Sequence, residues 1–254
     1  MQAVLDAMYK DRMLVIGHRG ASADAPMNTL PAFELAAEQG ADGIELDVHR
    51  SKDGHAVIVH DFTVDKTTNG SGMVTEMTLD ELKSLDAGSW FSKAFKDARI
   101  PTLDEVFEAV GQRLYVNVEI KSESQETDGV EQVVADVIAR YQMQQRVIVS
   151  SFNPLTLMRF RQIMPEVPIG FLHAPGSVID TRAIMEQLEL TYEADHPHES
   201  VIDAAYMQWA RARGYRVNTW TVNDPQRAQA LRELGVDAVI TDKPGALRQA
   251  LWGG

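Results

Sequence analysis

Short runs of β-branched and other apolar residues alternate with amphipathic segments along almost the whole chain of 254 residues. The short runs have the length and composition of buried strands, and the amphipathic segments repeat their apolar positions as helices do. The predicted strands are 14–17, 43–48, 56–59, 114–120, 147–151, 169–173, 190–194, 216–222 and 238–241. The predicted helices are 28–38, 103–111, 127–141, 154–163, 181–188, 199–213, 224–234 and 245–252.

This alternation predicts an α/β fold, a TIM-type (β/α)₈ barrel. About eight strand–helix units in roughly 250 residues fit a barrel better than a doubly wound sheet, which usually closes with fewer. Several predicted helices end at a glycine, as left-handed C-terminal caps do, at Gly40, Gly111, Gly214 and Gly235.

Segment 61–101 breaks the rhythm with the turn-forming run 67–72, a helical stretch at 78–83 and the aromatic pair Trp90-Phe91. We interpret it as a small insertion after the second strand, either a lid over a site or a surface elaboration. No linker or low-complexity tract interrupts the chain, so residues 1–254 are predicted to form a single barrel domain with this insertion.

Composition narrows the classes of function. The formal net charge of -13 and the pI near 4.9 leave no basic surface for duplex nucleic acid or anionic lipid. The absence of cysteine excludes disulfides, thiolate zinc sites and thiol nucleophiles. Charged residues interrupt the first segment and no long apolar stretch follows, so we expect no signal peptide, no membrane span and a cytoplasmic protein. The sequence specifies no oligomeric state.

Ionisable residues stand at the ends of several strand-like runs. His18 and Arg19 follow the first run, Glu45 and Asp47 lie in the second, His60-Asp61 follow the third, and Glu119 and Lys121 close the fourth. Charges that interrupt buried strands are costly unless they are paired or bound to a metal. Such a pattern indicates a metal-dependent enzyme that acts on a phosphate ester.

The carboxylates are the candidate metal ligands. Residues two apart in a strand face the same side, so Glu45 and Asp47 project together, as Asn117, Glu119 and Lys121 do in a second row. Carboxylates that converge would repel one another without a cation, and an all-oxygen set favours Mg²⁺ or Ca²⁺ over zinc. The alternative is that Glu45 and Asp47 only form ion pairs with Arg50 or Lys52.

His18 and His60 are the candidate acid and base, because imidazole has an unperturbed pKa of about 6.5. They could instead be metal ligands. Among the other histidines, His173 and His196 lie near late strand ends where a pocket would form, whereas His49 and His55 are expected in surface or turn positions.

Arg19 and Lys121 supply the positive charge that a phosphate needs in this acidic chain. Alternatively they only form salt bridges with neighbouring carboxylates. Trp220 could form an apolar wall over a small substrate or could pack in the core.

Several segments in order resemble one known family, the glycerophosphodiester phosphodiesterases. They are His18-Arg19-Gly20, the run Ala25-Pro26-x-Asn28-Thr29-Leu30-Pro31-Ala32-Phe33, Ile44-Glu45-Leu46-Asp47-Val48, His60-Asp61, Val118-Glu119-Ile120-Lys121, Trp220-Thr221-Val222-Asn223 and Thr241-Asp242-Lys243-Pro244. The resemblance covers nearly the full chain.

The resemblance implies a TIM-type barrel with one divalent ion on Glu45, Asp47 and Glu119. It also implies acid and base roles for His18 and His60, and a phosphate held by Arg19 and Lys121. One position departs from the family's pattern, since Met27 stands where members usually carry a glutamate beside the His-Arg-Gly segment. Its loss affects the bracing of Arg19 or the outer metal shell.

The activity expected from these motifs is hydrolysis of a glycerophosphodiester to glycerol 3-phosphate and an alcohol. The substrate's own glycerol hydroxyl would attack, giving a cyclic phosphate that water later opens. Two alternatives are a phospholipase D-like lipid hydrolase on the same barrel and a non-catalytic protein that binds phosphate esters.

Overall fold

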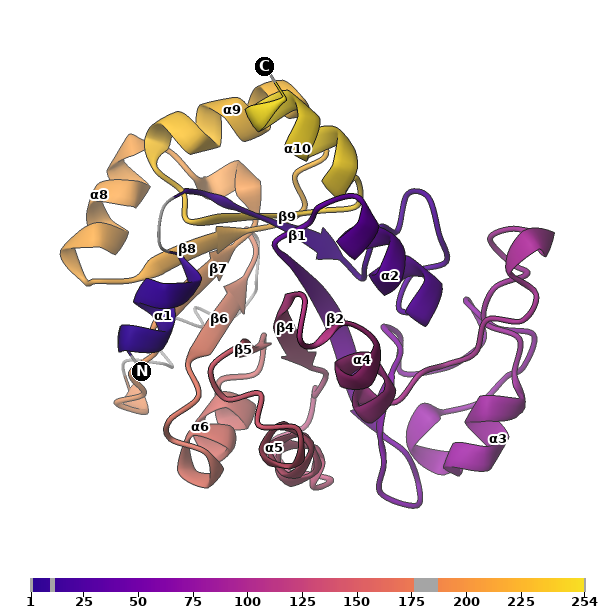
Figure 1. Cartoon of the computed structure of the whole chain (residues 1–254). Helices are drawn as coiled ribbons and strands as arrows, with labels where there is room; N and C mark the ends of the chain where they lie inside the picture. Colours follow the sequence, from indigo (N-terminus) through magenta and orange to yellow (C-terminus); the bar gives the residue numbers. More distant parts are fainter. Residues whose placement is uncertain (1, 10–11, 176–186, 254) are drawn as a thin grey trace.

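Parallel strands form a closed barrel in this computed structural model, which describes residues 2–9, 12–175 and 187–253. Within these residues the sheet runs β1-β9-β8-β7-β6-β5-β4-β2, and pairing of β1 with β2 closes it (Figure 1). The barrel strands are β1 Leu14–His18, β2 Gly43–Arg50, β4 Tyr115–Ile120, β5 Val147–Ser151, β6 Ile169–His173, β7 Ala194–Pro197, β8 Arg216–Thr219 and β9 Ala238–Thr241. The predicted eight-stranded barrel fold is therefore confirmed.

Helices lie outside the barrel, and all but the last, which follows β9, lie between one barrel strand and the next in the chain (Figure 1). They are α2 Leu30–Glu38, α4 Leu103–Val110, α5 Val130–Arg140, α6 Pro154–Ile163, α8 Ala204–Ala212, α9 Pro225–Leu234 and α10 Pro244–Trp252. Most begin within two residues of the predicted starts. The N-terminal part of the helix predicted at 181–188 falls on residues 176–186, which lie outside the described residues.

The ninth strand, β3 Ala56–Ile58, is not a barrel strand. It pairs antiparallel with the last residues of β2, Val48 to Arg50. The connection is too short for a parallel crossover, and Gly54 at φ 91° completes a turn in which its N–H bonds to the Ser51 carbonyl. The sequence prediction found this strand but did not separate it from the barrel strands.

Two other predicted elements are corrected by the structure. The strand expected at 190–194 begins only at Ala194, because the buried strand consists of Ala194, Asp195, His196 and Pro197, whose polar residues hide it from a hydrophobicity pattern. The helix expected at 199–213 divides into a 3₁₀ turn, η3 Glu199–Val201, and α8, because the Asp203 side chain accepts from the Tyr206 N–H and starts a new helix.

The first helix, α1 Gln2–Met8, was not predicted, and it covers the amino-terminal end of the barrel. Leu5, Met8 and Tyr9 pack with inward-facing residues of β1 and β9. The Tyr9 hydroxyl accepts a hydrogen bond of 2.6 Å from the Asn218 amide inside the barrel. This end of the barrel is thus filled, which leaves the carboxyl-terminal end for a site.

The segment after β3 forms the predicted insertion beside the barrel (Figure 1). It contains η1 Val74–Glu76, α3 Leu79–Ser84 and η2 Lys93–Phe95, and α3 begins with the capping box of Thr78 and Glu81. A separate apolar cluster holds it together, formed by Val57, Val59, Val64, Val74, Leu82, Ala87 and Ile100. Among the described residues, no helix combines the length and apolarity that a membrane span requires.

Three of the four glycines predicted as left-handed caps have positive φ, namely Gly40, Gly214 and Gly235. Gly111 does not, since its φ is -59°. A Cβ at Gly111 would lie 2.6 Å from the Phe107 carbonyl oxygen, so a close approach to the preceding turn explains this glycine instead.

Gly20 links the barrel to the site, because it follows His18 and Arg19 at φ 87° and packs on α2. A Cβ there would lie 2.5 Å from the Ala32 carbonyl carbon. We expect Gly20→Ala to lower the free energy of unfolding by about 2–5 kcal/mol, from left-handed strain and from overlap. Urea denaturation measures this.

Gly214→Ala is the matched control, since Gly214 has φ 75° but its added Cβ meets nothing within 4 Å. Only the strain of roughly 1–2 kcal/mol is expected there. Equal losses in the two variants would contradict the assigned contact between Gly20 and α2.

Candidate active site

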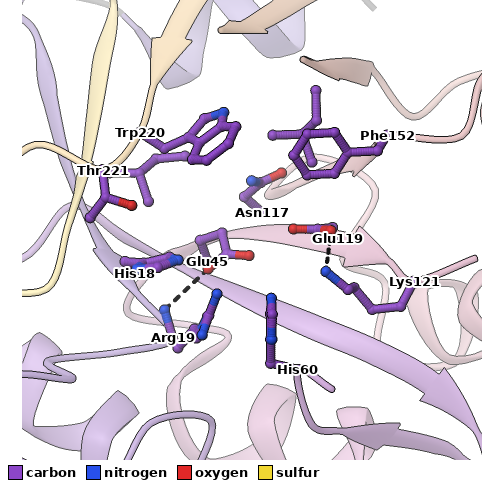
Figure 2. Close-up of a pocket in the computed structure, with 12 residues that line it drawn as sticks. His18, Arg19, Glu45, His60, Asn117, Glu119, Lys121, Phe152, Trp220 and Thr221 are labelled. Carbon is purple, nitrogen blue, oxygen red and sulfur yellow. Dashed lines mark hydrogen bonds and ion pairs between the residues drawn. The ribbon is translucent and has the colours of Figure 1, made fainter. Parts of the chain in front are cut away.

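A cavity with a volume of about 200 Å³ opens at the carboxyl ends of the barrel strands. Figure 2 shows charged side chains gathered on one side of it and aromatic side chains on the other. Asp47 contacts two of the lining residues, Arg19 and Lys121. The other main candidate residues line the cavity directly, namely His18, Arg19, Glu45, His60, Glu119, Lys121 and Trp220.

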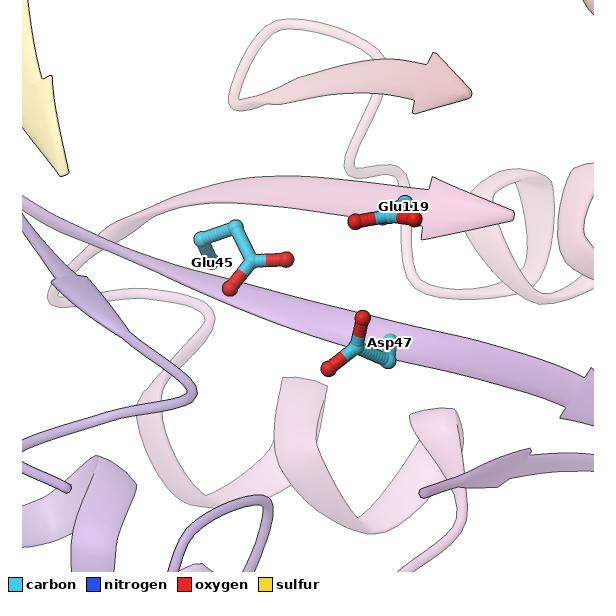
Figure 3. Close-up of side chains that lie close together, drawn as sticks. All are labelled: Glu45, Asp47 and Glu119. Atoms are coloured by element: carbon cyan, nitrogen blue, oxygen red, sulfur yellow. The ribbon is translucent and has the colours of Figure 1, made fainter. Parts of the chain in front are cut away.

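The three candidate metal ligands converge (Figure 3). Glu45 and Asp47 lie on β2, and Glu119 on β4 is the register partner of Asp47. Each offers a carboxylate oxygen, and these oxygens lie within 4.8 Å of one another. All three side chains are buried, so their mutual repulsion is only weakly screened by water.

The pKa values of these groups reflect the crowding. Burial, followed by the charges of Asp47 and Glu119, raises the pKa of Glu45 well above its usual value. Burial and the charge of Asp47 raise the pKa of Glu119 to about 7. Burial also acts to raise the pKa of Asp47, but Arg19 and Lys121 outweigh it and hold that pKa below its usual value.

This donor set fits a hard divalent cation. It consists of carboxylate oxygens, and Asp47 Oδ1 is buried with no hydrogen-bond partner among the described residues. The Lys121 ammonium lies 3.5 Å from it. A bound cation would pair with Asp47 Oδ1. Its positive charge would also offset the repulsion that raises the pKa values of Glu45 and Glu119.

Arg19 and Lys121 tie the carboxylates together. Arg19 Nε lies 3.2 Å from Asp47 Oδ2, and its backbone N–H donates to Glu45 Oε2 at 3.1 Å. Lys121 Nζ donates to Glu119 Oε1 at 2.7 Å. The salt bridges predicted as an alternative for Arg19 and Lys121 are therefore present. The ion pairs predicted as an alternative for Glu45 and Asp47, with Arg50 or Lys52, are not found among the described residues. Both cations also line the cavity, where an anion can reach them.

Each candidate catalytic histidine is held by a carboxylate. His18 Nδ1 lies 2.7 Å from Asp242 Oδ1, and His60 Nδ1 lies 2.6 Å from Asp61 Oδ1. Asp242 is itself fixed by the Ser22 hydroxyl at 3.0 Å and by the Asn223 amide at 2.6 Å. With Nδ1 engaged in this way, Nε2 is the ring nitrogen left for a substrate in the cavity.

Asp242 was quoted in a motif but not predicted as a site residue. Burial acts to raise the pKa of Asp242. The hydrogen bonds from His18, Asn223 and Ser22, together with the charge of His18, outweigh burial and lower this pKa to about 2. Its position directly after the strand Ala238–Thr241 follows the same strand-end rule that selected the other site residues, and that signal could have found it.

Three of the remaining histidines differ from expectation. His49 was expected at the surface, but it is buried beside Phe62, and burial lowers its pKa to about 4. His173 and His196 were expected near the pocket, and neither lines it. His196 is fully buried within the barrel and bonded to Asn218, while His173 pairs with Asp195. His55 is exposed, as expected.

Trp220 forms part of an apolar wall, as one of the two sequence readings had it (Figure 2). Its indole N–H donates to the His196 carbonyl at 2.9 Å, which fixes the ring. Phe152, which was not predicted, packs edge-on against the Trp220 ring, with 5.5 Å between the ring centroids. Phe152 is 40 % exposed. Leu172 and Ile240 extend the wall.

Met27 stands directly against Arg19. Arg19 Nη1 lies 3.4 Å from the Met27 thioether sulfur, which is a weak acceptor in place of a carboxylate. The neighbouring Asn28 donates to Asp47 Oδ2 at 2.8 Å, so a second contact from the same loop braces the acidic cluster.

Comparison with known proteins relates most of the chain to a single enzyme family. Residues 18–246 match the model of the glycerophosphoryl diester phosphodiesterase family. A glycerophosphodiester phosphodiesterase from Caldanaerobacter subterraneus is 42% identical over 237 residues, covering 93% of this chain and 96% of the relative. One from Bacillus subtilis is 31% identical over 248 residues, covering 92% of this chain and 85% of the relative.

A solved structure supports the same relationship. A phosphodiesterase from Oleispira antarctica, solved in complex with the product sn-glycerol-3-phosphate, superposes with a TM-score of 0.83 at 33% identity. The match covers 96% of this chain and 98% of that one.

The raised pKa values of the glutamates predict that metal binding releases protons. Because the pKa of Glu119 is raised to about 7 and that of Glu45 is also raised by burial and the neighbouring carboxylates, the metal-free protein retains protons at this site that a cation must displace. We expect apparent affinity for Mg²⁺ or Ca²⁺ to fall and proton release to rise as the pH is lowered from 8.5 to 6. Calorimetric titration of chelator-treated protein in two buffers of different ionisation enthalpy measures both.

Glu45→Gln should bind metal more weakly and release fewer protons. Glu131→Gln is the control, because Glu131 is a buried carboxylate outside the cavity that pairs with Arg159. Equal proton release at pH 8.5 and pH 6, or an equal loss of metal affinity in the control, would contradict Glu45 as a candidate ligand.

Proposed function

The chain belongs to the glycerophosphoryl diester phosphodiesterase family, and from that premise we propose that it hydrolyses glycerophosphodiesters to glycerol 3-phosphate and an alcohol such as choline or ethanolamine. The observation that carries this proposal is one cavity that joins a buried carboxylate triad, two histidine–carboxylate pairs and two cationic side chains. Each of these serves a separate requirement of phosphodiester cleavage.

Glu45, Asp47 and Glu119 are the proposed ligands of one divalent cation, Mg²⁺ or Ca²⁺. A bound ion would supply positive charge that favours ionisation of the attacking hydroxyl and offsets the negative charge that develops on the phosphate. Arg19 and Lys121 hold the phosphate through charge-assisted hydrogen bonds, and both already face the cavity.

His18 and His60 are the proposed acid and base. One imidazole takes the proton from the glycerol hydroxyl next to the phosphoester, and that oxygen attacks phosphorus. The other imidazole protonates the departing alcohol oxygen as its bond to phosphorus breaks. The cyclic glycerol phosphate is then opened by water, with the proton transfers reversed. Asp242 and Asp61 keep the rings oriented for these transfers.

Trp220 is proposed to contact the substrate through the apolar wall. Binding energy is concentrated on the glycerophosphate by the charged residues, so tolerance of different alcohol groups is expected. Two points remain predictions. One is that residues 1–254 form a single domain with its insertion at 61–101, and the other is that the enzyme works in the cytoplasm.

A release assay for glycerol 3-phosphate tests the function. Glycerophosphocholine and glycerophosphoethanolamine should be hydrolysed with Mg²⁺ or Ca²⁺ and spared in excess chelator. An analogue without the hydroxyl next to the phosphoester should bind but not react, because the nucleophile is missing. No turnover of any glycerophosphodiester would refute the proposal, and preference for lysolipids would favour the phospholipase D-like alternative.

Substitution of the histidines separates acid–base catalysis from metal ligation. We expect His18→Ala and His60→Ala each to lower kcat by roughly 10²–10⁴ while metal affinity stays near wild type. His55→Ala is the matched control, since His55 is exposed outside the cavity. Kinetics and metal titration on the same samples decide, and lost metal affinity in either site variant would assign that histidine to the metal instead.

A further inference from the structure

Asn117 is a buried amide that faces the cavity without a partner. Its side chain is 3% exposed and lines the cavity, and neither its Nδ2 nor its Oδ1 has a hydrogen-bond partner among the described residues. Burying an amide with both polar atoms unpaired is costly, so such a group in a cavity is expected to meet a ligand or water there.

The register of the sheet places Asn117 beside the carboxylates but deeper in the barrel. Asn117 precedes Glu119 by two residues on β4, so it lies on the same face roughly 7 Å towards the amino end of the strand. Its register partner on β2 is Glu45. Figure 2 shows it between the Glu45 and Glu119 carboxylates and the rings of Trp220 and Phe152.

The surroundings of Asn117 separate it from the phosphate contacts. Arg19 and Lys121 lie at the ends of β1 and β4, nearer the mouth of the barrel. The apolar wall beside Asn117 includes Leu172 and Ile240, which offer no hydrogen bonds from their side chains. A ligand whose phosphate lies near Arg19 and Lys121 would therefore extend its carbon chain towards Asn117.

We propose that Asn117 is a specificity-determining residue that recognises the terminal hydroxyl of the glycerol group, so that the constant part of the substrate occupies the deep end of the cavity. This inference rests on the proposed function. A carboxamide is both donor and acceptor, as a hydroxyl is, and the two can satisfy each other in either direction. A site with such a buried partner rejects an analogue that lacks the hydroxyl, because the amide is then left unpaired.

The test compares glycerophosphocholine with 2-hydroxypropyl phosphocholine, which lacks only the terminal hydroxyl and keeps the attacking one. We expect the wild-type enzyme to prefer glycerophosphocholine by about 10-fold or more in kcat/KM. Asn117→Ala should lose about 10-fold on glycerophosphocholine, change the analogue by no more than about threefold, and so abolish the preference.

Equilibrium binding keeps this test separate from the proposed function. In the presence of Mg²⁺, sn-glycerol 3-phosphate should bind the wild-type protein about 10-fold more tightly than 2-hydroxypropyl phosphate, and Asn117→Ala should bind the two equally. If wild type turns over no diester, the enzymatic proposal fails, while this ratio still decides the role of Asn117.

Asn218→Ala is the matched control. Asn218 is another buried asparagine of the barrel interior, but its amide nitrogen already bonds to Tyr9 and His196 and it does not line the cavity. Its selectivity should match wild type. Asn117→Ser is the second variant if Asn117→Ala does not fold, as judged by thermal unfolding, and it should show the same loss of preference.

Two outcomes would overturn the inference. An unchanged preference in the Asn117 variants would show that the amide does not read the hydroxyl. Loss of Mg²⁺ affinity with equal losses on both substrates would make Asn117 a ligand of the metal.

Discussion

Three carboxylates held within 4.8 Å of one another in a buried cavity are the constraint around which the rest of the site is arranged. Two such charges at that distance repel by about 3 kcal/mol at an effective dielectric constant of about 20. The fold offsets this with Arg19, Lys121 and the Asn28 amide, each in contact with Asp47 or Glu119. Most of these stabilising contacts are made with Asp47. The repulsion that remains therefore falls mainly on Glu45 and Glu119, and a bound cation would reduce it.

The same constraint explains why the site depends on barrel closure. Glu45 and Glu119 lie on strands paired side by side, but His18 and Asp242 meet only because β9 pairs with β1 at the seam. They are separated by 224 residues in the chain. Geometry at the site is therefore set by strand register more than by loop conformation, apart from His60, which the β2–β3 hairpin carries into place.

The spacing of hydrophobic residues predicted the barrel, and the placement of charged residues at strand ends predicted the charged part of the site. Both signals are local properties of the chain. Alternation within β2 and β4 correctly brought Glu45, Asp47 and Glu119 together. What failed depended on partners distant in sequence. The polar residues Asp195 and His196 hide β7 from a hydrophobicity pattern, and their partners, Tyr206 and Asn218, come from later segments of the chain. His49 is buried beside Phe62 of the insertion. The pairing of Asp242 with His18 likewise required the closed barrel.

The balanced charges at the site have a consequence for how substrates arrive. Arg19 and Lys121 are already paired with carboxylates, so little free positive potential projects into solvent from a chain with a net charge of -13. At low ionic strength this field would slow the approach of diesters with net negative charge, whereas zwitterionic choline and ethanolamine diesters would feel little of it. Near physiological salt, where the screening length is about 8 Å, the difference largely disappears. Selectivity among head groups would then vary with ionic strength at the encounter step, before any contact in the pocket is made.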